Sequence, residues 1–94
     1  MTALDLQIDS VSLVKCVLKL EKWNGIKSGK YKSNDTENPD ERIAYWETEK
    51  QKNLERLKAH GFAAFPEIMN IVGLFAPVFP FIFDEIKKIF NITF

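Results

Sequence analysis

Few side chains in this sequence are of the types that perform covalent or metal chemistry. The chain has one histidine, His60, and one cysteine, Cys16, among its 94 residues. A structural zinc site needs several Cys and His ligands, so we expect no metal site. A catalytic histidine needs an orienting acid and a nucleophile, and the sequence carries no signature of either. The sequence therefore predicts a protein that is not an enzyme and that binds no cofactor.

The histidine and the cysteine both have structural interpretations. His60 falls in the last turn of a predicted helix, where a protonated imidazole stabilises the negative end of the helix dipole. Cys16 falls near the polar edge of another predicted helix, among lysines that would lower the pKa of its thiol. We expect a half-buried, unreactive thiol rather than a nucleophile, and a lone cysteine excludes a disulfide within the chain.

The residues that could bind an anion lie in the segment 22–32. Here lysines stand beside Trp23 and Tyr31, a combination that lets a protein hold phosphates while its rings stack on bases. The glycines of this segment lack the spacing of a phosphate-binding loop. A solvated loop is therefore the favoured interpretation, and a phosphate-ligand or nucleic-acid binder is kept as an alternative. The candidate anion-binding residues are Lys22, Lys27, Lys30 and Lys32.

The charge balance gives a nucleic-acid partner little support. The 13 basic residues are matched by 13 acidic ones, whereas DNA-binding domains usually carry a marked positive excess. The first residues include Asp5 and Asp9 and no basic residue, unlike a secretory signal peptide. We expect a cytoplasmic protein, with membrane association as the alternative.

The aromatic residues are concentrated in the last third of the chain. All eight phenylalanines follow Gly61, so a charged part, 1–61, precedes a Phe/Pro-rich apolar part, 62–94. The apolar part can complete an ordinary core, expose a surface to a partner, or contact a membrane. The segment 62–83 has about the length of a spanning helix, but it contains Glu67 and is interrupted by prolines. A membrane-associated protein that uses this segment is therefore an alternative.

Hydrophobic periodicity predicts four helices in a single domain, residues 1–94. Apolar and polar residues alternate from Leu4 to Asp9, which is typical of extended chain, so an extended N-terminal arm is expected before the first helix. A long polar loop, 24–38, is expected after this helix, which Gly25 can end. The predicted helices span residues 10–23, 39–60, 66–76 and 80–91.

Side-chain patterns assign the faces of these helices. In the second helix Asn38 suits the N-cap, Pro39 the first position and Gly61 the left-handed stop. Its narrow apolar stripe suits packing along one neighbouring helix. The apolar residues predicted to share one half of the first helix are Val11, Leu13, Val14, Val17, Leu18 and Leu20. Those predicted to face inward from the last helix are Ile82, Phe83, Ile86, Ile89 and Phe90.

The sequence as a whole predicts an all-α protein, a small four-helix bundle. We expect a small binding or assembly protein that contacts a protein partner, or other copies of itself, through apolar helical faces. Aromatic side chains contribute most to such interfaces, because each one buries a large rigid area. The predicted partner-binding residues are Trp46, Phe79, Phe81, Phe83 and Phe90.

Overall fold

The computed structural model describes residues 3–32, 37–75 and 79–91, without the side chains of residues 3 and 79–81. These residues form α1 (Ala3–Lys27), α2 (Pro39–Ala59), α3 (Phe65–Gly73) and α4 (Phe79–Ile89), with a short 3-10 helix, η1 (Phe62–Ala64), before α3. No strand is present among them. The predicted all-α class with four helices is confirmed.

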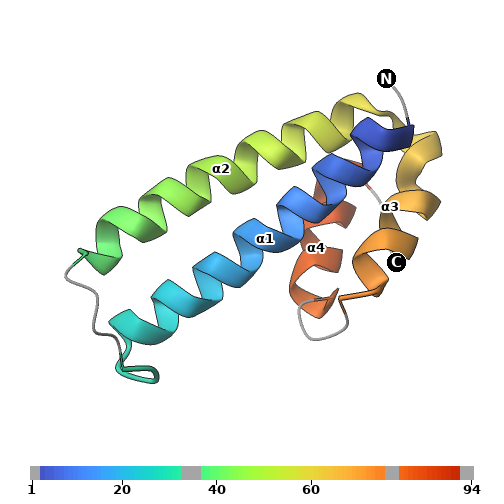
Figure 1. Cartoon of the computed structure of the whole chain (residues 1–94). Helices are drawn as coiled ribbons and strands as arrows, with labels where there is room; N and C mark the ends of the chain where they lie inside the picture. Colours follow the sequence, from blue (N-terminus) through green and yellow to red (C-terminus); the bar gives the residue numbers. More distant parts are fainter. Residues whose placement is uncertain (1–2, 33–36, 76–78, 92–94) are drawn as a thin grey trace.

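The two long helices form an antiparallel hairpin, and the two short ones pack across one half of it (Figure 1). The largest contact between elements is that of α1 with α2. Both α3 and α4 contact α1 near the end of the molecule that holds the N-terminus. The result is an elongated molecule of 43 × 25 × 21 Å, in which the other half of the hairpin extends as two helices alone.

The start of α1 differs from the prediction. The helix begins at Ala3, so the predicted extended arm is wrong. The alternating pattern fits a helix here because its apolar residues point to opposite sides. Leu6 is 6% exposed and faces the core, whereas Leu4 and Ile8 are 63% and 53% exposed and face solvent.

The end of α1 also differs, since the helix continues through Gly25 to Lys27. The chain then folds back, and the Tyr31 amide donates to the Gly25 carbonyl over 3.1 Å. The Tyr31 ring occupies the place where a side chain on residue 25 would begin. This glycine therefore permits a close approach and does not end the helix. Residues 33–36 of the predicted loop lie outside the described part of the chain.

The limits of α2 agree with the prediction. Asn38 Oδ1 accepts a hydrogen bond from the Asp40 amide over 2.9 Å, which satisfies one free donor of the first turn. Pro39 opens the helix, and Gly61 follows its end with a φ of +90°, a conformation that favours glycine.

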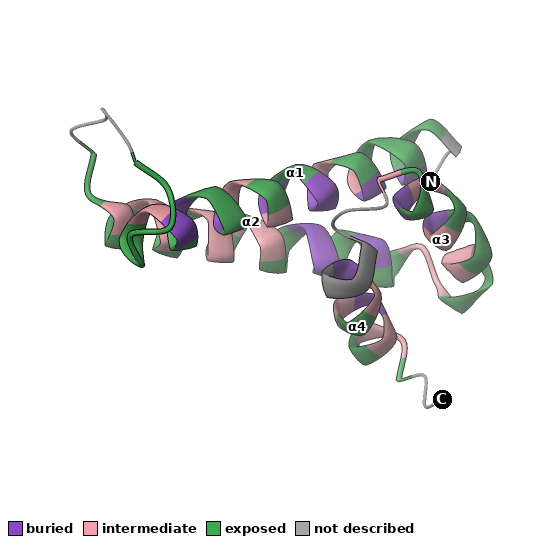
Figure 2. Ribbon diagram, turned by 90° about the horizontal axis from the view of Figure 1, so that it is seen from below, coloured by how far each residue is buried: buried purple, intermediate pink, exposed green. Residues whose placement is uncertain are grey.

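The short helices supply the rest of the core. The end of the third predicted helix, after Phe75, lies outside the described residues, and the helix itself stops at Gly73. The limits of α4 lie close to those predicted. Figure 2 shows the buried segments that face one another where the four helices meet. The buried apolar residues of this core are Leu6, Leu13, Val14, Leu54, Leu57, Ile68, Val72, Ile82 and Ile86.

Candidate interaction surface

A second apolar face of α1 points away from the core. Leu4, Ile8, Val11 and Leu18 are 63%, 53%, 41% and 46% exposed. With Lys15 and Lys22 they recur at alternating steps of four and three residues. We call this set the outer stripe: Leu4, Ile8, Val11, Lys15, Leu18 and Lys22.

The outer stripe is a continuous seam rather than a scatter of single apolar residues. At ~100° per residue its members fall within about 80° of the helix surface. The buried Leu13 lies about 180° from the centre of this arc. Alternating four- and three-residue spacing is the pattern by which one helix packs along another. In Figure 2 exposed segments recur along α1 between the buried ones.

A pocket of about 400 Å³ lies beside the stripe. Its apolar wall comes from α1 and from Phe75, which follows the end of α3, and three lysines of α1 also line it. An apolar side chain could enter this pocket, while the ammonium groups around it would favour an acidic neighbour. The lining residues are Val11, Val14, Lys15, Leu18, Lys19, Lys22 and Phe75.

The outer stripe corrects the predicted face of the first helix. Val11 and Leu18, expected on the core-facing half, lie on the outer stripe instead. The four-three spacing that begins at Leu4 is the signal that identifies it. Lysines at two of its positions and the strand-like alternation of its first residues conceal this signal in the sequence.

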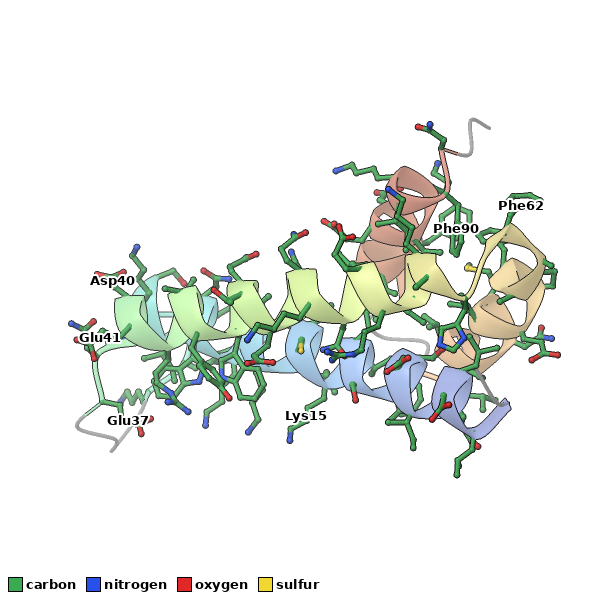
Figure 3. The ribbon with its side chains drawn as sticks, turned by 90° about the horizontal axis from the view of Figure 1, so that it is seen from above. Lys15, Glu37, Asp40, Glu41, Phe62 and Phe90 are labelled. Atoms are coloured by element: carbon green, nitrogen blue, oxygen red, sulfur yellow. The ribbon has the colours of Figure 1, made fainter. Side chains whose placement is uncertain are left out.

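Trp46, a predicted partner-binding residue, lies half-buried on α2. The ring centres of Trp46 and Tyr45 lie 4.9 Å apart with the rings nearly perpendicular, and the Lys15 ammonium lies 5.9 Å from the Trp46 ring centre. The indole Nε1 is buried and has no hydrogen-bond partner among the described residues. Lys15 itself projects outward from α1 (Figure 3). Because Lys15 belongs to the outer stripe, its contact with the Trp46 ring joins Trp46 to the stripe.

The C-terminal phenylalanines contribute mainly to contacts within the chain. Phe90 is half-buried and packs against Phe62 and Phe65, with ring centres 6.3 and 6.0 Å away. Phe62 is 65% exposed and lies beside Phe90 at the end of the molecule (Figure 3). Phe83 is half-buried, with the Lys87 ammonium 5.1 Å from its ring centre. The side chains of the two remaining candidates, Phe79 and Phe81, lie outside the described part.

Of the candidate anion-binding lysines, Lys27 and Lys30 line one pocket of about 670 Å³ together with Glu21, whereas Lys22 and Lys32 are not among its lining residues. Lys22 and Lys30 lie over the rings of the residues that follow them, at 5.0 and 5.3 Å. Lys27 pairs with Asp40 at 2.7 Å, and Lys32 is exposed beyond the end of α1. Lys22 and Lys27 belong to α1 and not to a loop. The structure therefore does not direct the four toward one anion.

Cys16 is buried between α1 and α2, with 3% of its surface exposed. The predicted position at a polar edge is wrong, because α2 covers this side of α1. The Asn53 amide nitrogen lies 3.2 Å from its sulfur. Burial raises the pKa of the Cys16 thiol above its ordinary value, and this outweighs the hydrogen bond and the nearby cations. The thiolate, which is the reactive form, is therefore disfavoured.

A chain of polar contacts continues from Asn53 to the end of the hairpin. Arg56 donates to Asn53 Oδ1 over 2.5 Å and to Asp9 Oδ1 over 3.3 Å. His60 Nε2 lies 2.9 Å from Asp9 Oδ2, and the His60 side chain is 5% exposed. His60 holds the predicted place at the end of α2, but its ring pairs with α1. These contacts join the two helices, and the Cys16 thiol at their beginning is buried with its pKa raised.

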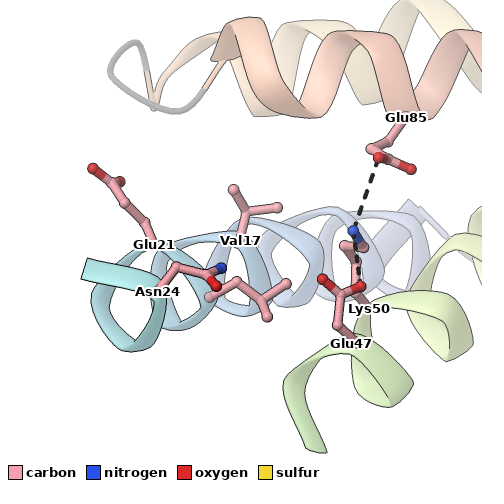
Figure 4. Close-up of a pocket in the computed structure, with 7 residues that line it drawn as sticks. Val17, Glu21, Asn24, Glu47, Lys50 and Glu85 are labelled. Carbon is pink, nitrogen blue, oxygen red and sulfur yellow. Dashed lines mark ion pairs between the residues drawn. The ribbon is translucent and has the colours of Figure 1, made fainter. Parts of the chain in front are cut away.

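Another charged cluster joins α2 to α4. The Lys50 ammonium lies 3.2 Å from a Glu47 oxygen and 3.8 Å from a Glu85 oxygen (Figure 4). The Lys50 side chain is 13% exposed, so its charge is partly shielded from water and needs these carboxylates. The pocket beside it measures about 260 Å³. Because two acids already neutralise the Lys50 ammonium, its role is to stabilise the packing of α4 on α2.

No family model, curated protein or solved structure matches the chain. Within the described ranges, no group of His, Cys, Asp and Glu side chains could hold a metal ion. Nor does any helix in that part of the chain combine the length and apolar character needed to cross a membrane. The outer stripe with its pocket combines exposed apolar side chains with the spacing of a helix-packing seam.

Proposed function

We propose that this chain is a small protein-binding protein without enzymatic activity, and that the outer stripe of α1 is its binding surface. The observation that carries the proposal is the heptad-like series of exposed apolar residues on the side of α1 opposite the core. Among the described residues, no member of the stripe belongs to the core or to the residues packed against it, yet the spacing of the stripe is that of a helix-packing seam.

The other chemically interesting groups support this choice because each one has a partner inside the molecule. Cys16 is buried against Asn53, and Lys50 lies between two carboxylates. A free thiol of this kind stays reduced in the cytoplasm, which is the location we propose. We therefore propose that the outer stripe acts by contact with a partner and not by catalysis.

A photo-crosslinking amino acid placed at Leu18 tests the proposal in cells that express the full chain. We expect irradiation to give a discrete protein adduct, because Leu18 is 46% exposed and lines the apolar pocket. The matched control carries the same probe at Gln51, an exposed position of α2. Absence of an adduct at Leu18, or equal adducts at both positions, would contradict the proposal.

A charge on the stripe provides a second readout. Leu18→Asp should remove the adduct formed by a probe at Val11, because a carboxylate cannot be desolvated in an apolar contact without a large cost. The melting temperature should change little, since the position is exposed in the folded chain. If Leu18→Asp unfolds the protein, the stripe belongs to the core and the proposed surface is wrong.

A further inference from the structure

The charges on α1 are distributed unequally along its length. Asp5 lies in the first turn, whereas Lys15 lies at the middle of the helix and Lys19 and Lys22 lie beyond it. Two of these lysines belong to the outer stripe, and its apolar residues dominate the opposite end. Two copies of the outer stripe are therefore complementary in charge only when their helices run antiparallel.

A parallel pair of stripes would bring like charges together. Lys15 of each chain would face the same residue of the other, and Lys22 would do likewise. Such layers destabilise the parallel arrangement, because the two ammonium groups repel one another inside the seam.

An antiparallel pair removes this conflict. In the stripe's heptad register, Ile8 of one chain lies against Leu18 of the other. Lys15 then lies against Val11, and Lys22 against Leu4, so that each lysine can cover an apolar residue with its methylene stem.

The residues beside the stripe agree with the same register. Asp5 and Lys19 occupy equivalent flanking positions on the side of the stripe nearer α2, and antiparallel pairing places Asp5 of one chain beside Lys19 of the other. The twofold symmetry of the pair makes this attractive contact twice.

We propose that a second copy of this chain is the partner, paired antiparallel through α1 of each copy. This inference rests on the proposed function of the outer stripe. In this arrangement Ile8 of the second copy enters the hole between Lys15, Leu18, Lys19 and Lys22, and these four residues line the pocket of about 400 Å³. A net charge of zero leaves no overall repulsion between the copies.

Sedimentation of the purified full chain over a range of concentrations tests the proposal. We expect the mass to rise from 10.9 kDa toward twice that value as the concentration increases. Ile8→Asp should keep the protein monomeric throughout without changing the melting temperature measured for the monomer, because Ile8 is 53% exposed. A wild-type chain that stays monomeric at the highest soluble concentration would overturn the proposal.

Charge exchange tests the antiparallel register. Asp5→Lys alone and Lys19→Asp alone should each weaken association by roughly tenfold or more, because each one introduces two like-charge contacts per dimer. A mixture of the two variants should associate as well as the wild type, since both contacts become attractive again. Gln51→Lys is the matched control and should have no effect. Failure of the mixture to recover association would exclude this register.

The two proposals fail separately. A purified chain that is monomeric, while the Leu18 probe captures a protein other than this chain in cells, would exclude the self-pairing and leave the proposed function standing. A monomeric chain that also gives no Leu18 adduct in cells would exclude both.

Discussion

The Cys16 thiol is more stable in its protonated form inside the folded chain than it is in water. Burial raises its pKa above the ordinary value of 9.0. As the pH increases, the unfolded chain therefore loses this proton before the folded chain does. The folded state then binds more protons than the unfolded state, so the free energy of unfolding falls as the pH rises. The contribution of Cys16 is fully present well below pH 9 and is lost as the pH passes through the folded pKa.

Cys16→Ser provides the matched variant for this effect, because serine keeps a small polar group beside Asn53 and does not titrate in this range. We expect the free energy of unfolding of the wild type to fall more steeply than that of the variant between about pH 8 and pH 10. Urea unfolding at a series of pH values measures both slopes. Titration of lysines and tyrosines is common to the two proteins and cancels in the comparison. Equal slopes would show that the thiol is not desolvated in the folded state.

At the scale of the helix, the Tyr31 ring that lies over Gly25 limits which residues position 25 can hold. Gly25→Ala should favour the helical conformation by ~1 kcal/mol, but the new methyl group would overlap the Tyr31 ring and cost about 1–3 kcal/mol. We expect a net loss of about 1 kcal/mol in the free energy of unfolding, measured by thermal or urea unfolding.

Two controls separate these contributions to the effect of Gly25→Ala. Gly73→Ala, at a helical position with open space around it, should be neutral or stabilising by up to ~1 kcal/mol. In a Tyr31→Ala background, Gly25→Ala should also stabilise. If the substitution still destabilises there, the ring is not the cause.

Gly25 also shows where prediction from the sequence reaches its limit. A glycine after an amphipathic segment commonly ends a helix, and only the folded chain shows that Tyr31 returns to this position. The start of α1 was hidden for a related reason, since Leu4, Leu6 and Ile8 fit a period of two as well as a helix with two apolar sides. Local signals sufficed for α2, because Asn38 and Gly61 act within a few residues of its ends. The outer stripe required the helix to be traced from its true beginning.

The whole molecule is extended for its length. The radius of gyration of 14.2 Å exceeds the ~12 Å expected for a compact domain of 94 residues. The excess arises from the half of the hairpin that α3 and α4 do not cover. That half has Leu20 and Trp23 as buried apolar residues from α1, and α2 contributes none there among the described residues.

Backbone amides of this uncovered half should therefore exchange with deuterium faster than those of the covered half. We expect faster exchange for residues 20–27 and 39–46 than for 10–14 and 53–57, because local opening exposes less apolar surface there. Mass spectrometry of peptides from the exchanged protein measures the difference. Uniform protection along α1 and α2 would show that the hairpin opens as one cooperative unit.

A core built from all four helices has a consequence for the order of events during synthesis. Leu6 and Leu13 are made well before Ile82 and Ile86, with which they share the core. Because a chain emerges from the ribosome in sequence order, α1 and α2 are exposed before α4 follows them. The core-facing side of α1 therefore lacks the cover of α4 until that helix has emerged as well. In that interval the nascent hairpin is the form of this protein most open to chaperones.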